Sequence, residues 1–64
     1  MPFSERELAI MHHLVQGFST NRQIARDLGI TEGAVKVHLA RLFQKLGVES
    51  RSDVRAWARD NGIG

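Results

Sequence analysis

Three glycines divide this 64-residue chain into short helices, and that division limits the fold more than any other feature of the sequence. Gly17, Gly29 and Gly47 each follow a stretch in which apolar residues recur with a helical period, and glycine is common where helices stop. No stretch shows the sustained two-residue alternation of a half-buried strand. The sequence therefore predicts an all-α fold.

Residues that cap helices indicate where each helix begins. Ser4 precedes Glu7 by three residues and Thr20 precedes Gln23 by three, so the sequence contains two capping boxes. Thr31 is a further cap. These signals predict four helices, over residues 4–16, 20–28, 31–46 and 52–61.

The fourth helix is expected to begin at Ser52, with Ser50 as a competing cap. In this helix Val54, Trp57 and Ala58 face the core, and we interpret Trp57 as a core residue. The chain has no cysteine, so neither a disulfide nor a thiolate–zinc site stabilises it. Apolar packing must therefore stabilise the fold, and hydrophobic residues make up 42% of the sequence.

The second and third predicted helices are joined by a turn of about three residues that contains Gly29, which is typical of a helix-turn-helix. The third helix has two unlike sides when its residues are placed at about 100° per step. One side is an apolar stripe, in which we expect His38 to be buried and hydrogen-bonded: Val35, His38, Leu39, Leu42, Phe43 and Leu46. The opposite side carries two cations and several short residues: Gly33, Lys36, Val37, Ala40, Arg41 and Gln44.

This second side has the composition that recognition in the major groove of DNA requires. Small residues such as Gly33 and Ala40 allow a helix to approach base edges. Lys36 and Arg41 can donate to phosphates or to guanine, and Val37 can contact thymine methyl groups. The same composition also fits a face that simply meets solvent.

Basic residues are concentrated in the second half of the chain. Residues 33–64 contain six basic residues (Lys or Arg) and three acidic residues (Asp or Glu). Residues 1–32 contain three basic and four acidic residues. This asymmetry favours a polyanionic partner. A membrane partner is not expected, because no apolar run approaches the roughly 18 residues of a membrane span and no signal-peptide pattern is visible.

The histidines do not indicate a metal site. His12 and His13 are neighbours on a helix and point about 100° apart, so they cannot chelate one ion. We expect no metal and no cofactor, and no enzymatic activity, because the polar residues fall in caps and turns that already have structural roles. The role of Arg51 stays open between an ion pair with an acid such as Glu7 and a contact with phosphate.

The chain resembles the LuxR/NarL-type (GerE-like) DNA-binding domain of bacterial transcription regulators. The resemblance spans nearly the whole chain, and we treat residues 1–64 as one such domain with its helix-turn-helix at about 20–46. The start at Phe3 and Ser4, where the family domain begins, favours a segment of a longer regulator. The matching stretches are SERE (4–7), QG (16–17), NRQIARDLGITE (21–32), AVKVHL (34–39), QKLGV (44–48) and SRS (50–52).

The resemblance implies that the third helix enters the major groove of double-stranded DNA. Residues at the start of the second helix and near Thr31 would contact phosphates. Glu32 has two candidate roles, as a partner of the helix dipole and as a DNA contact. The candidate DNA-binding residues are Asn21, Arg22, Thr31, Glu32, Gly33, Lys36, Val37, Ala40 and Arg41.

The resemblance also implies a cytoplasmic protein that forms a weak homodimer on DNA through its fourth helix. Arg55, Ala56 and Arg59 lie off the core face of that helix and are candidates for the dimer contact, although a face that simply meets solvent is favoured for an isolated domain. RNA polymerase is a further candidate partner. A competing hypothesis is a protein-interaction module, in which the same face of the third helix binds an acidic partner such as RNA polymerase. His13 replaces a residue that is often apolar in the family, which leaves two alternatives: a loosened first helix, or a ring that caps a nearby carbonyl.

Overall fold

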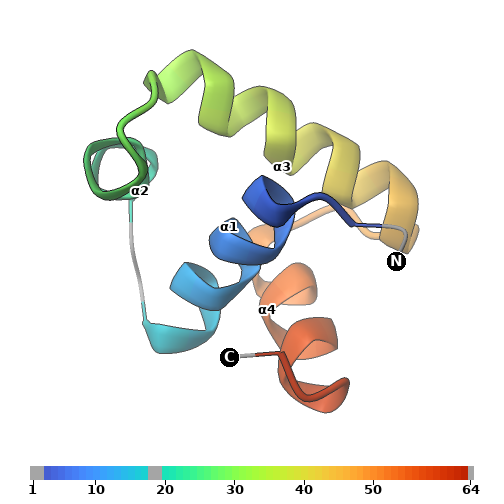
Figure 1. Ribbon diagram of the computed structural model, residues 1–64. Coiled ribbons are helices and arrows are strands. Elements are labelled where there is room, and N and C mark those ends of the chain that lie inside the picture. Colours follow the sequence, from blue (N-terminus) through green and yellow to red (C-terminus); the bar gives the residue numbers. More distant parts are fainter. Residues whose placement is uncertain (1–2, 18–19, 64) are drawn as a thin grey trace.

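The computed structural model describes residues 3–17 and 20–63, and these residues form four helices and no strand (Figure 1). The prediction of an all-α fold is therefore confirmed. Each of the first three helices begins one residue after its predicted start, because the cap residue itself keeps an extended backbone. The helices are α1 (Glu5–Gln16), α2 (Asn21–Leu28), α3 (Glu32–Leu46) and α4 (Arg51–Asp60).

The predicted caps of the first three helices are formed. The Ser4 hydroxyl accepts from the Glu7 amide at 3.1 Å, and Glu7 Oε1 accepts from the Ser4 amide at 2.8 Å. Thr20 and Gln23 form the equivalent pair on α2. At the other end of α2, Gly29 adopts the left-handed conformation, with φ 68°, that ends the helix and allows the turn into α3.

The predicted cap of α4 was wrong. Ser50, rather than Ser52, is the N-cap, and its hydroxyl accepts from the Asp53 amide at 3.1 Å. Ser50 has the extended backbone of a cap (φ −140°, ψ 161°), whereas Ser52 already lies inside the helix. The helix therefore begins at Arg51, which brings that side chain to the first turn of α4.

The four helices share one apolar core. It contains the following fully or almost fully buried side chains: Ile10, Met11, Leu14, Ile24, Ala25, Val35, Leu39, Leu42, Val54 and Ala58. Trp57 is only partly buried, so its assignment as a core residue needs correction. Its ring instead packs edge-on against Phe3 at the rim of the core, with ring centroids 5.4 Å apart.

The arrangement of the helices leaves one side of α3 uncovered. Helix α1 packs against both α3 and α4, and α2 packs against α3 near the N-terminal end of α3 (Figure 1). Arg6 reaches from α1 to α2, where its Nη1 donates to the Leu28 carbonyl at 3.0 Å. None of the helices in the described ranges is both long enough and apolar enough to cross a bilayer.

Candidate nucleic-acid interface

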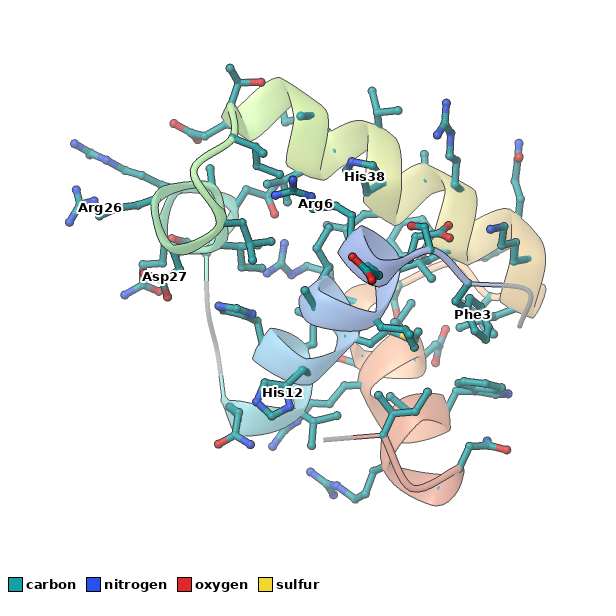
Figure 2. All side chains as sticks on the ribbon, in the orientation of Figure 1. Phe3, Arg6, His12, Arg26, Asp27 and His38 are labelled. Atoms are coloured by element: carbon teal, nitrogen blue, oxygen red, sulfur yellow. The ribbon has the colours of Figure 1, made fainter. Side chains whose placement is uncertain are left out.

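One side of α3 faces away from the other helices, and we call it the outward face. All its members are exposed: Glu32, Gly33, Lys36, Val37, Ala40, Arg41 and Gln44. Helical periodicity produces this result, because Val35, Leu39 and Leu42 point into the core from the other side of the same helix. Side chains of α3 project from the body of the molecule along this edge (Figure 2).

Val37 is the most distinctive residue of the outward face. Its side chain is 51% exposed, and it is the only large apolar side chain that is exposed among the residues that the structure describes. A single exposed valine is common in proteins. Here, however, the exposed cations Lys36 and Arg41 lie on the same face. The face thus combines an apolar contact point with donors for an anionic partner.

Gly33 has no packing role in the fold. A Cβ atom at this position would meet only the Thr31 hydroxyl oxygen, at 3.8 Å, which is ordinary van der Waals contact. Glycine inside a helix costs up to about 1 kcal/mol relative to alanine. The position therefore gives up helix stability without a structural benefit inside the chain, as expected where a backbone must approach a ligand closely.

The predicted phosphate contacts lie beside the outward face. Arg22 and Thr31 are exposed, and the Thr31 hydroxyl accepts from the Ala34 amide at 3.0 Å as the cap of α3. Asn21 is half-buried at the start of α2, and its Oδ1 accepts a hydrogen bond from Arg51 Nη1. The structure therefore gives Arg51 a partner that the sequence did not indicate.

A hollow of about 330 Å³ lies between the starts of α2 and α4 and the adjacent side of α3. Three of the predicted DNA-binding residues come together there, Asn21 of α2 and Lys36 and Ala40 of α3. Its polar and small lining residues are Asn21, Lys36, Ala40, Glu49, Ser50 and Arg51. Glu49, Ser50 and Arg51 were not among the predicted site residues, because only the fold brings them next to Asn21.

An ion pair between an exposed lysine and a buried carboxylate holds the C-terminal end of α3. Glu7 is 2% exposed, and Lys45 Nζ donates to its Oε1 at 2.7 Å. Lys45, rather than Arg51, is thus the partner of Glu7. Burial raises the pKa of Glu7, but hydrogen bonds from Lys45 and Ser4 and the charge of Lys45 outweigh burial, so the pKa is lowered overall.

The histidines lie away from the outward face. His13 Nδ1 is 2.8 Å from the Ala9 carbonyl, which confirms the predicted carbonyl cap, and its Nε2 is 3.4 Å from Asp27 Oδ2 on α2. His38 is only half-buried, and its buried Nδ1 has no hydrogen-bond partner among the described residues, which corrects the expectation of a buried, bonded ring. Within residues 3–17 and 20–63, no three His, Cys, Asp or Glu side chains gather at one point.

The short turn between α2 and α3, and the packing of α3 across α1, define a helix-turn-helix domain. Residues 1–58 match the GerE family, described as bacterial regulatory proteins of the luxR family. The chain belongs to this family, which confirms the resemblance inferred from its sequence.

Several characterised proteins are similar to this chain. It is 55% identical to the nitrate/nitrite response regulator protein NarP of Escherichia coli K12 over 53 residues, which cover 78% of this chain and 24% of that protein. It is 45% identical to the CsgBAC operon transcriptional regulatory protein of the same strain over 58 residues, or 91% of this chain and 26% of that protein. The chain thus spans about a quarter of the length of these relatives.

A solved structure agrees with the computed one over the whole chain. The response regulator ChrA of a heme-sensing two-component system superposes with a TM-score of 0.88 at 41% sequence identity. The superposition covers 100% of this chain and 31% of ChrA.

Proposed function

We propose that this chain binds double-stranded DNA in a sequence-specific manner, with α3 in the major groove. The observation that carries the proposal is the outward face of α3, where Val37 is 51% exposed and shares the face with Lys36 and Arg41. A B-DNA major groove about 12 Å wide admits one helix. Family membership supports the same function, because the relatives NarP and the CsgBAC operon regulator are named as regulatory proteins.

Each residue of the outward face has a role in this proposal. Lys36 and Arg41 donate to guanine O6 and N7 or to phosphates, while Val37 and Ala40 contact thymine methyl groups. Gly33 allows the start of α3 to approach the bases closely. Those of the contacts that are made to bases read the base sequence.

The remaining candidates orient the domain on the duplex. Asn21, Arg22 and Thr31 contact phosphates, and such contacts fix the register of a protein without reading sequence. Glu32 is an exposed carboxylate in the first turn of α3. It stabilises the helix start through the dipole, and it is also a candidate acceptor for a cytosine amino group.

The biological role that follows is that of the DNA-binding domain of a bacterial transcription regulator, which acts in the cytoplasm because bacterial DNA lies there. Two copies would bind adjacent half-sites, as helix-turn-helix dimers do. Ala56 and Arg59 are exposed on α4 and are candidates for a weak contact between copies that forms only on DNA. Contact with RNA polymerase is a further candidate interaction.

Binding to selected duplexes tests the proposal. Sites selected from random duplexes give the half-site sequence and spacing, and fluorescence anisotropy then gives the affinity at several salt concentrations. The logarithm of the binding constant is expected to fall against log salt with a slope of about −0.9 per phosphate contact. Absence of duplex binding at low salt by folded protein would exclude DNA as the ligand and favour the protein-interaction module.

A matched pair of variants separates the proposed interface from general electrostatic attraction. Arg41→Ala removes a cation from the outward face, and Arg26→Ala removes an exposed cation from the last turn of α2. Arg41→Ala is expected to weaken binding by about tenfold, as one lost contact to an ionised group does. Equal losses from the two variants would contradict the placement of α3 on the duplex.

A further inference from the structure

Arg51 and Asn21 link the first residues of two helices that are distant in sequence. Arg51 begins α4 and Asn21 begins α2. Arg51 Nη1 donates to Asn21 Oδ1, and both residues are half-buried. The contact lies at the hollow that Lys36 and Ala40 of the outward face also line. It is therefore part of the border of the proposed interface and not of the core.

The chemistry of this pair fixes how the Asn21 side chain is turned. A guanidinium group has N–H donors and no acceptor, so it must face the amide oxygen of an asparagine and not its nitrogen. The amide nitrogen of Asn21, with its two N–H donors, then points away from Arg51. Without Arg51, rotation by 180° about the last side-chain bond would exchange oxygen and nitrogen.

The pair also changes the strength of the donors. An amide oxygen that accepts from a cation is polarised, and hydrogen bonds in a chain strengthen one another by about 10–30% per bond. The N–H groups of Asn21 therefore become better donors to an anion. The exposed cation Lys36 lines the same hollow as Asn21 and favours an anion there, while the carboxylate of Glu49, which also lines the hollow, opposes one.

We propose that Arg51 is a positioning residue for DNA binding, which turns the Asn21 amide so that its N–H groups donate to a phosphate oxygen at the edge of the major groove. The inference rests on the proposed function, because it names how one of the phosphate contacts is prepared. It assigns Arg51 no contact with DNA of its own. Arg51 acts through Asn21.

A double-mutant cycle tests this dependence. The affinities of the chain and of its Asn21→Ala, Arg51→Ala and doubly substituted forms for one selected duplex are measured by fluorescence anisotropy at constant salt. If Arg51 acts through Asn21, each single substitution weakens binding by about tenfold and the double substitution by no more than the larger single effect. Losses that multiply to about a hundredfold would show that Arg51 contacts phosphate independently, which overturns the proposal.

Two controls keep the result interpretable. Arg26→Ala, which removes an exposed cation from the last turn of α2, should leave the affinity within about twofold. Thermal melting of each variant verifies that binding is measured on folded protein. Failure of the unsubstituted chain to bind any selected duplex would reject the proposed function itself, and would be distinct from an additive cycle on a chain that binds.

NMR spectroscopy of the Asn21 side chain gives a second test, and its main measurement uses the unsubstituted protein. In the unsubstituted protein, the side-chain ¹H–¹⁵N signals of Asn21 are expected to shift on addition of the selected duplex, because a phosphate accepts from them. The conservative variant Arg51→Lys, which keeps a donor and a charge, should retain most of this shift. Unchanged Asn21 side-chain signals in the saturated complex would overturn the proposal.

Discussion

Lys45 Nζ lies 2.7 Å from Glu7 Oε1, and this contact joins the last turn of α3 to the first turn of α1 across 38 residues of sequence. Glu7 also completes the cap of α1 through the Ser4 amide. One buried carboxylate therefore sets the start of one helix and holds the end of another. Since the proposed DNA-reading residues lie on α3, the orientation of that helix depends partly on a charge.

This dependence predicts acid sensitivity. The pKa of Glu7 lies below its ordinary value of 4.5 in the folded protein, so its ionised form favours folding. The stabilisation is complete above the ordinary pKa and is lost as pH falls through the lower, folded value. We expect the Tm to drop as the pH falls below the ordinary pKa of 4.5, and to drop less in Glu7→Gln, which is already less stable near neutral pH. Circular dichroism melts measure this, and equal drops in both proteins would contradict the role of Glu7.

The core predicts different costs for two large apolar side chains. Leu42 is fully buried, whereas Trp57 lies at the rim against Phe3. Leu42→Ala should cost about 2–5 kcal/mol, enough to unfold much of a domain this small. Trp57→Ala should cost about 1.5–3 kcal/mol, because part of its surface already meets water. Urea titrations followed by circular dichroism measure the free energy of unfolding of both variants. A larger loss of stability in Trp57→Ala than in Leu42→Ala would show that the rim contact stabilises the fold more than the burial of Trp57 indicates.

Replacing Gly33 with alanine is expected to raise the stability of the fold and to lower the affinity for DNA. Gly33→Ala adds a methyl group that meets only the Thr31 hydroxyl oxygen, at ordinary van der Waals distance, so the folded state should gain about 0.4–1 kcal/mol. The same methyl group should weaken DNA binding if the start of α3 approaches the duplex closely. Thermal melting and anisotropy on the same sample measure both effects. Gly29→Ala is the matched control, since its φ of 68° makes alanine strained and should lower the Tm.

Replacing Lys36 with alanine is expected to change how strongly the chain prefers its own DNA site over an altered one. Lys36→Ala should cost about 1–3 kcal/mol of binding energy on the preferred site if this residue reads a base. The loss should be smaller on a duplex altered at the base pair that Lys36 contacts. Competition between the preferred and altered duplexes measures the difference. An equal loss on every duplex would show that Lys36 contacts phosphate only.

The local features of the fold were predictable because they depend on neighbouring residues. Ser4, Thr20 and Thr31 cap helices through amides three residues away, and such spacings are visible in a sequence. The fourth helix shows the limit of this reasoning. Ser50 and Ser52 are equally good caps by type, and the choice between them depends on where the chain leaves α3.

The long-range side-chain contacts were not predictable for the same physical reason. Lys45 and Arg51 each had several acidic or amide side chains as possible partners, and sequence spacing does not rank them. Burial of Glu7 and the position of the α4 start decide the outcome. The direction of the outward face could be predicted from helical period alone, because Val35, Leu39 and Leu42 fix which side of α3 is inside.

The separation of the two sides of α3 has a consequence for how such a domain diversifies. Lys36, Val37 and Arg41 are exposed, while the same helix is held by core residues and by Lys45 at its end. Exchanging the exposed three therefore leaves the architecture intact. With the proposed DNA-reading role of these residues, a family built this way would acquire new target sites by changing a handful of positions, and a designer would graft one member's preference onto another without rebuilding the protein.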